Sequence, residues 1–231
     1  IDHSLLNPAL TVEELEAGCQ VALRYNTASV CIMPYYAARC ADLLRGSTVQ
    51  PSTTIGFPHG GLHTAIKLAE VQQALKDGAT ELDMVINISR AKSGDWDYVS
   101  REIKELTNAI HAGGARIKVI FENAYHDDEA KIRLCEICGD IGVDWVKTST
   151  GYAATGATME DLRLMRKHSP AHVQVKAAGG IRDLDALLAV REIGVTRVGA
   201  TRTITMLEEC RKRLGMPALD AQPAVPQTAG Y

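Results

Sequence analysis

Short apolar or β-branched runs alternate with longer amphipathic stretches along most of the chain. The short runs cover residues 1–6, 28–33, 53–57, 81–87, 116–122, 144–148, 172–177 and 197–200. The longer stretches, in which apolar residues recur at helical spacing, cover residues 12–25, 36–44, 64–77, 97–111, 128–141, 159–167, 184–192 and 204–214. Strands that alternate with amphipathic helices indicate β–α units and a parallel sheet.

Eight such units predict an α/β fold, a single (β/α)8 TIM barrel, whose catalytic domain we place at residues 1–214. Gly78 and Gly142 each follow a helical stretch directly before a strand, where a glycine often ends a helix. An open doubly wound sheet is the alternative, but the G-x-G-x-x-G turn typical of that fold follows none of the predicted strands. Residues 215–231 contain three prolines and are expected to form a flexible C-terminal tail.

The composition is that of an ordinary soluble globular protein. The 231 residues are 46% hydrophobic and 23% charged, and 25 Lys and Arg against 28 Asp and Glu give a net charge of −3. These values exclude a disordered chain. The sequence has neither an apolar run of ~18 residues nor a signal-peptide pattern, which predicts a soluble, cytoplasmic protein without membrane contact. The near-neutral charge, without a basic block, argues against binding to nucleic acid.

Neither the cysteines nor the histidines form a metal-binding pattern. Cys135 and Cys138 make a single C-x-x-C inside a predicted helix, where this spacing places two small apolar side chains on one helical face. A zinc site needs a second pair of ligands, which the sequence does not offer. His59 and His63 are four residues apart, but the glycine pair between them disfavours a regular helix. We therefore expect no metal.

Four predicted strands each carry a charged residue that the alternation of side chains directs into the barrel. These residues are Asp83, Lys118, Lys147 and Lys176. In a strand with period two, their apolar neighbours face the helices while the charged side chains face the lumen. Lys147 and Lys176 also fall near the C-terminal ends of neighbouring strands, where TIM barrels place their active sites.

Two lysines and an aspartate in one lumen suit carbon–carbon bond chemistry through an imine. An ammonium group that lies close to another one, partly removed from water, has a lowered pKa. A neutral lysine amine attacks a carbonyl carbon and forms a Schiff base. A nearby carboxylate such as that of Asp83 moves protons directly or through a water. The alternative is that these lysines only form salt bridges at the strand ends, with their charged groups in solvent.

Glycine-rich turns follow the last two predicted strands. Residues 178–182 read AGGIR, and residues 199–203 read GATRT. In TIM barrels these loops commonly bind phosphate through backbone N–H groups and a helix N-terminus. Arg182 or Arg202 would add positive charge to such a site. Ordinary turns between strands and helices are the alternative interpretation.

The sequence resembles the deoxyribose-phosphate aldolase family nearly from end to end. The segments that carry the resemblance most specifically are VKTSTG at residues 146–151, VKAAGGIR at 175–182 and ELDMVIN at 81–87. Further matching segments are DHSLL at 2–6, SVCI at 29–32, IGFP at 55–58, KSG at 92–94 and IKVI at 117–120.

The resemblance implies a class I aldolase that needs neither a metal nor an organic cofactor. Such an enzyme reversibly cleaves 2-deoxy-D-ribose 5-phosphate into acetaldehyde and D-glyceraldehyde 3-phosphate. The resemblance implies that Lys147 forms the imine and that Lys176 keeps Lys147 neutral. Asp83, with Lys176 and a water, would move the proton that makes the enamine. Substrate binding is implied for Asp2, Cys31, Lys118 and Thr148. Together with the glycine-rich turns, we expect phosphate binding by Gly151, Gly179, Gly180, Thr201 and Arg202.

Other partners implied by the resemblance are small aldehydes, a sugar phosphate and a second copy of the chain in a homodimer. The chain ends in Tyr231, as many family members end in tyrosine. A mobile tail would bring this phenol over the barrel mouth to assist proton transfer. A disordered end without a function is the alternative.

Four positions depart from the family pattern. Asn7 stands where lysine is common, Met33 where asparagine is common, and Asn123 where threonine is common. Arg202 stands where the family usually has a serine, whereas Thr201 before it keeps a hydroxyl. Arg202 therefore changes the charge and shape of the predicted phosphate site, while the imine chemistry is untouched.

Two other functions stay open at the level of sequence. A related Schiff-base aldolase with a non-phosphorylated acceptor or a ketone donor would use the same lysines, and tests of acetaldehyde against dihydroxyacetone separate the donors. A module that binds sugar phosphates without catalysis is the alternative from another class. Simple binding, however, needs none of Lys147, Lys176 and Asp83.

Overall fold

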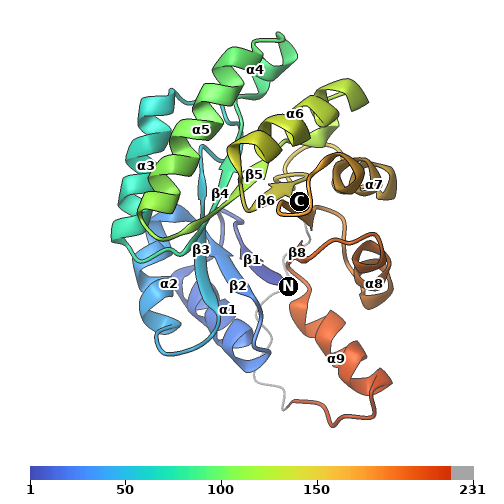
Figure 1. Cartoon of the computed structure of the whole chain (residues 1–231). Helices are drawn as coiled ribbons and strands as arrows, with labels where there is room; N and C mark the ends of the chain where they lie inside the picture. The colour runs from blue at the N-terminus through green and yellow to red at the C-terminus, as the bar shows by residue number, and fades with distance from the viewer. Residues whose placement is uncertain (220–231) are drawn as a thin grey trace.

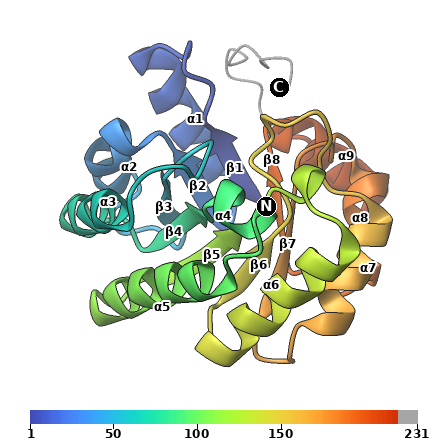
Figure 2. The same ribbon diagram turned by 90° about the horizontal axis from the view of Figure 1, so that it is seen from above.

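The computed structural model describes residues 1–219, and its eight parallel strands close into one barrel (Figure 1). Seen from above, the strands form an inner ring that the helices surround (Figure 2). Each strand pairs with the next along the chain, and β8 (Arg197–Ala200) pairs with β1 (Asp2–Leu5) to close the ring. The predicted TIM barrel is therefore confirmed.

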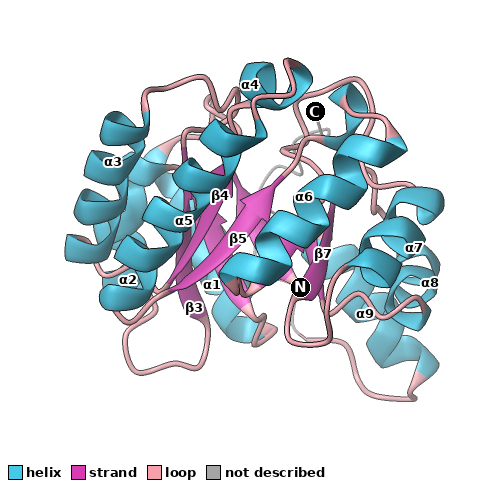
Figure 3. Cartoon of the chain, turned by 45° about the horizontal axis from the view of Figure 1, so that its top comes forward, coloured by secondary structure: helices cyan, strands magenta, loops and turns pink. Residues whose placement is uncertain are grey.

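Strands alternate with helical segments along the chain, with the helices outside the enclosed strands (Figure 3). The other strands are β2 (Ser29–Ile32), β3 (Gln50–Ile55), β4 (Glu81–Val85), β5 (Arg116–Ile120), β6 (Trp145–Lys147) and β7 (Gln174–Ala178). The α-helices are α1 (Val12–Arg24), α2 (Ala37–Leu43), α3 (Thr64–Lys76), α4 (Ile88–Lys92), α5 (Trp96–Ala112), α6 (Asp128–Ile141), α7 (Met159–His168), α8 (Leu184–Glu192) and α9 (Thr203–Arg213). Two short 3₁₀ helices are η1 (Pro34–Tyr36) and η2 (Asn123–Tyr125).

Local sequence explains where several helices begin and end. Thr11 and Glu14 form a capping box at the start of α1, since each side chain accepts a hydrogen bond from the backbone N–H of the other residue. Asp95 and Asp127 cap α5 and α6 in the same position. Gly142, with φ at 81°, ends α6 in the left-handed conformation, as the sequence predicted.

The largest differences from the sequence-based expectation are in β3 and α4. β3 begins at Gln50, whereas the apolar run predicted a start at residue 53. Pro51 hid this extension, because a proline lacks a backbone N–H and is rare inside a sheet. Its carbonyl still accepts the N–H of Thr80 at 2.9 Å. Helix α4 was not predicted, since it is only five residues long and begins at the side-chain cap of Asn87.

The hydrophobic core lies between the outer face of the strands and the surrounding helices. Leu82 and Met84 of β4 and Val119 of β5 belong to this core, together with residues of α3, α5 and α6. Because side chains alternate along a strand, the residues between these apolar ones point into the lumen. The inside of this barrel is consequently polar and charged where many barrels hold layers of branched apolar residues.

The first residues of the predicted tail contact α9. Arg211 donates from Nη2 to the carbonyl of Pro217 at 2.7 Å, and the backbone N–H of Leu219 donates to Glu208 at 3.2 Å. Tyr231 and its predicted role lie outside the described residues. Within residues 1–219, no helix combines the length and the apolar character that crossing a membrane requires.

Candidate active site

Three lysines converge on the carboxylate of Asp83 inside the barrel. Lys147 and Lys176 each donate from Nζ to Oδ2 of Asp83 at 2.7 Å, and Lys118 donates to Oδ1 at 2.7 Å. The strand register produces this convergence, because Asp83 lies opposite Lys118 and Lys147 lies opposite Lys176. All four side chains are buried. The structure thus brings together the four charged residues that the alternation placed in the lumen.

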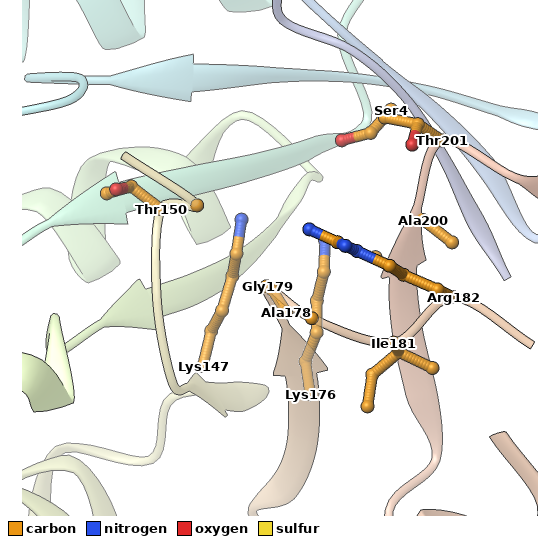
Figure 4. A pocket seen from close by; sticks show the side chains of 13 residues that line it. Ser4, Lys147, Thr150, Lys176, Ala178, Gly179, Ile181, Arg182, Ala200 and Thr201 are labelled. Atoms are coloured by element: carbon orange, nitrogen blue, oxygen red, sulfur yellow. The ribbon is translucent and has the colours of Figure 1, made fainter. Parts of the chain in front are cut away.

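Lys147 and Lys176 are the two members of this cluster that line a cavity at the C-terminal ends of the strands. Figure 4 shows them side by side, extending in the same direction from β6 and β7. The cavity measures about 570 Å³ with its open mouth. Asp83 and Lys118 are not among its lining residues. A ligand in the cavity therefore meets the two amines, while the carboxylate supports them from beneath.

The surroundings give Lys147 and Lys176 opposite tendencies to hold a proton. Burial lowers the pKa of Lys147, and the charge of Lys176 lowers it further, against the opposing effect of Asp83. Burial would also lower the pKa of Lys176, but the carboxylates of Asp2 and Asp83 outweigh it and raise that pKa. Burial opposes ionisation of Asp83, yet the neighbouring lysines hold the pKa of its carboxyl well below the usual range. The site therefore makes a proton easier to remove from Lys147 and harder to remove from Lys176.

Asp2 and Cys31 adjoin the cluster to which Lys118 belongs, and none of these three residues lines the cavity. Oδ2 of Asp2 lies 2.6 Å from Nζ of Lys176 and 3.6 Å from Nζ of Lys118. Cys31 of β2 is buried, and burial raises the pKa of its thiol. These positions support an influence on the charge of the lysines, and direct contact with substrate stays a prediction.

Thr148 joins β6 to β7 through its side chain. Its hydroxyl donates to the carbonyl of Ala178 at 3.0 Å and accepts the N–H of Ala178 at 3.1 Å. Thr148 is fully buried and lies outside the cavity lining. Because both bonds occupy the hydroxyl, the structure favours a role in aligning Lys147 over the predicted contact with substrate.

The glycines predicted to bind phosphate lie at the cavity. Gly151, Gly179, Gly180 and Thr201 all line it. Gly179 and Gly180 have φ values of 83° and 85°, a conformation that favours glycine. Gly156 packs so closely that a Cβ added there would lie 2.4 Å from the backbone of Gly179. This close approach holds the loop after β6 against the turn after β7.

Of the two arginines considered for the phosphate site, the structure brings Arg182 to the cavity and leaves Arg202 out. Arg182 lines the cavity, and its side chain points toward the side where Lys147 and Lys176 lie (Figure 4). Arg202 is exposed, precedes α9 at the N-cap position and is absent from the lining. At this turn Thr203, which begins the helix, takes the buried position, and Arg202 before it takes the exposed one.

Ser4, Thr150 and Glu122 belong to this site and were not predicted. Ser4 and Thr150 line the cavity. Glu122 is buried, has a left-handed backbone with φ at 60°, and accepts bonds from the N–H and hydroxyl of Thr150. The alternation from Asp2 could have indicated Ser4. The Glu122–Thr150 contact spans 28 residues, and no local pattern indicates it.

Among residues 1–219, no group of three or more His, Cys, Asp and Glu side chains is arranged to hold a metal ion. Cys135 and Cys138 pack in the hydrophobic core. His59 and His63 are exposed in the loop before α3. The C-x-x-C pair therefore contributes to core packing.

The chain is similar to known aldolases over nearly its whole length. The model of the DeoC/LacD family of aldolases matches residues 1–208. A deoxyribose-phosphate aldolase of Rhodopirellula baltica is 63% identical over 220 residues, which cover 95% of this chain and 91% of that protein. One of Thermococcus gammatolerans is 44% identical over 213 residues, which cover 91% of this chain and 95% of that protein.

Solved structures agree with these relatives. The aldolase QR15 superposes with a TM-score of 0.88 at 36% identity, covering 93% of this chain and 95% of its own. The deoxyribose phosphate aldolase of Aeropyrum pernix, described as a unique tetrameric structure, gives 0.85 at 30% identity, covering 92% and 89%. This chain therefore belongs to the DeoC/LacD family of aldolases.

Proposed function

We propose that this protein is a class I aldolase that reversibly cleaves 2-deoxy-D-ribose 5-phosphate into acetaldehyde and D-glyceraldehyde 3-phosphate. The observation that carries the proposal is the pair of lysines that share Oδ2 of Asp83 and line one cavity. Of this pair, Lys147 has the lowered pKa and Lys176 the raised one. The names of the similar proteins supply the substrate.

Lys147 supplies the nucleophile. Its neutral amine adds to the C1 aldehyde of the open-chain sugar, and loss of water leaves an imine between Nζ and C1. The C2–C3 bond breaks as the C3 hydroxyl loses its proton. The electrons of that bond form the enamine of C1 and C2, and D-glyceraldehyde 3-phosphate leaves. Protonation at C2 and hydrolysis of the imine then release acetaldehyde and restore the amine.

Lys176 and Asp83 hold the protons that these steps exchange. The ammonium of Lys176 disfavours a proton on Lys147, so the nucleophile is ready when substrate arrives. Asp83, ionised between the lysines, accepts and returns protons through Lys176 or a water. Two groups with opposite protonation states beside one reacting carbon suit both directions of the reaction.

The phosphate group is placed over the turns after β7 and β8. Gly179, Gly180 and Thr201 line that side of the cavity, and Arg182 adds the positive charge there. Backbone N–H groups beside helix N-termini and a guanidinium group are typical partners of phosphate.

Replacing Arg182 with leucine should raise KM for deoxyribose 5-phosphate about 10- to 100-fold, because a bond to a charged group is worth roughly 1.5–3 kcal/mol. Cleavage of unphosphorylated 2-deoxyribose should keep its KM, since that substrate lacks the charge that Arg182 binds. The matched variant Arg202→Leu should change KM less than about twofold, because Arg202 does not line the cavity. Steady-state kinetics with both sugars measure these effects. If Arg202→Leu raised KM for deoxyribose 5-phosphate strongly and Arg182→Leu did not, Arg202 would be the arginine that binds the phosphate.

Trapping with borohydride tests the imine itself. Acetaldehyde and sodium borohydride should add an ethyl group to Lys147, and mass mapping of the peptides locates it. The exposed Lys104 serves as an internal reference for unspecific modification. The same protein should release acetaldehyde from deoxyribose 5-phosphate. Labelling of Lys104 without labelling of Lys147 would overturn the proposed mechanism.

The proposed function also suggests an oligomeric state and a cellular compartment for this protein. We expect at least a homodimer, which is supported by the tetramer described for the Aeropyrum pernix structure. We expect the protein to act in the cytoplasm, because ionised sugar phosphates do not cross membranes unaided.

A further inference from the structure

Arg197 and Glu81 form an ion pair at the end of the barrel opposite the cavity. Arg197 is the first residue of β8 and Glu81 the first of β4, whereas the cavity lies at the C-terminal ends of the strands. Nη2 of Arg197 lies 2.8 Å from Oε1 of Glu81, and its Nη1 lies 2.6 Å from Oδ1 of Asp2. Neither Arg197 nor Glu81 lines the cavity, and the proposed reaction uses neither.

The buried charges of the lumen balance when one lysine is neutral. The carboxylates of Asp2, Glu81 and Asp83 have no exposed surface, and each forms ion pairs with two of the cations Lys118, Lys176 and Arg197. The six contacts, all at 2.6–2.8 Å, are Arg197–Asp2, Arg197–Glu81, Lys118–Glu81, Lys118–Asp83, Lys176–Asp2 and Lys176–Asp83. Within residues 1–219, the one ion-pair contact of the fourth cationic side chain, Lys147, is to the Asp83 oxygen that Lys176 already binds. A proton on Lys147 would therefore be a buried charge without a carboxylate of its own.

We propose that Arg197 and Glu81 are positioning residues that set the protonation state of Lys147 through the balance of charges in the lumen. They act from the end of the barrel opposite the cavity, through their ion pairs with Asp2 and Lys118 and the contact of Lys118 with Asp83. The inference rests on the proposed function, because it concerns the amine that forms the imine. It adds to the residues of the proposed mechanism two side chains that touch neither the cavity nor the reacting atoms.

Other side chains border the lumen, and Arg182 lines the same cavity as Lys147. Burial raises the pKa of the Cys31 thiol, which faces the lysines, and so keeps it uncharged. Glu122 bonds Thr150 in the loop after β6, and burial raises the pKa of its carboxyl. Trp145 carries no charge and packs against the guanidinium of Arg197, whose Cζ lies 4.9 Å from the centroid of the ring.

Arg116 offers a matched control at the same end of the barrel. Its Nη2 lies 2.7 Å from Oε1 of Glu81, as close as that of Arg197, and it also packs on Trp145. Its side chain is 44% exposed, against 12% for Arg197. Water screens an exposed charge, so Arg116 should contribute little to the balance.

The test measures how fast the imine on Lys147 is trapped by borohydride as a function of pH. Only the neutral amine reacts, so trapping rises with pH through the pKa of Lys147. Arg197→Met leaves an excess of negative charge, which favours a proton on Lys147 and should move this rise to higher pH. Glu81→Gln leaves an excess of positive charge and should move it to lower pH. We expect each shift to be about one pH unit, the effect of one nearby charge in a shielded interior.

The double variant Arg197→Met with Glu81→Gln removes one charge of each sign and should return the profile to that of the unmodified protein. Arg116→Met should shift it by less than about 0.3 pH units. A merely structural role of the pair predicts lower amounts of active protein with an unchanged pH profile, which would overturn the inference. Shifts of the same sign in both single variants would overturn it too. No trapping on Lys147 at any pH, in the unmodified protein, would instead refute the proposed function.

Discussion

Replacing Lys147 with methionine is expected to lower the rate of deoxyribose 5-phosphate cleavage about 10⁴-fold or more. The variant keeps the length of the side chain but removes the amine, so the covalent imine does not form. Binding of substrate should persist, because the residues around the phosphate are unchanged. The fold should persist as well, since Asp83 keeps its bonds to Lys118 and Lys176. Release of acetaldehyde measures the rate, and thermal unfolding checks the fold.

Lys104→Met is the control for this variant. Lys104 is an exposed lysine on α5, outside the lining of the cavity, and its loss should leave the rate within about twofold. Borohydride trapping should fail in Lys147→Met and persist in Lys104→Met. A Lys147→Met protein that still forms an adduct on Lys176 and turns over at the original rate would move the nucleophile to the second lysine.

Asp83→Asn is expected to impair both stability and catalysis. The carboxylate of Asp83 contacts three buried lysines at 2.7 Å, and breaking a buried ion pair by removal of one partner costs about 3–5 kcal/mol of unfolding free energy. The turnover number should fall at least about 10²-fold, because the group that exchanges protons with Lys176 and water is lost. Urea unfolding and steady-state kinetics measure the two effects.

The loss of stability in Asp83→Asn should shrink as the pH rises. Without the carboxylate, the pKa of Lys147, which burial already lowers, falls further below its value in the unfolded chain. Between these two values the unfolded state binds more protons than the folded one, so the free energy of unfolding increases with pH. Asp140→Asn, at an exposed site of α6, should show no such slope. If both variants showed the same dependence of stability on pH, the effect would not come from the buried site, and this prediction would be wrong.

Much of this architecture follows from short-range patterns in the sequence. The period of two placed Asp83, Lys118, Lys147 and Lys176 inside the barrel, because the direction of a side chain in a strand depends only on its neighbours. The same pattern leaves out α4 and the first residues of β3, since a five-residue helix and a strand with Pro51 resemble loops.

Closure of the barrel decided which of the inward-facing residues form ion pairs with one another. Arg197 and Glu81 are 116 residues apart, and they meet only because β8 pairs with β1 and completes the ring. The choice of Arg182 over Arg202 likewise depends on how each loop enters its helix. The amino-acid sequence by itself determines the residue types and the faces they occupy. Their protonation depends on burial and on distances through space, which exist only once the chain has folded.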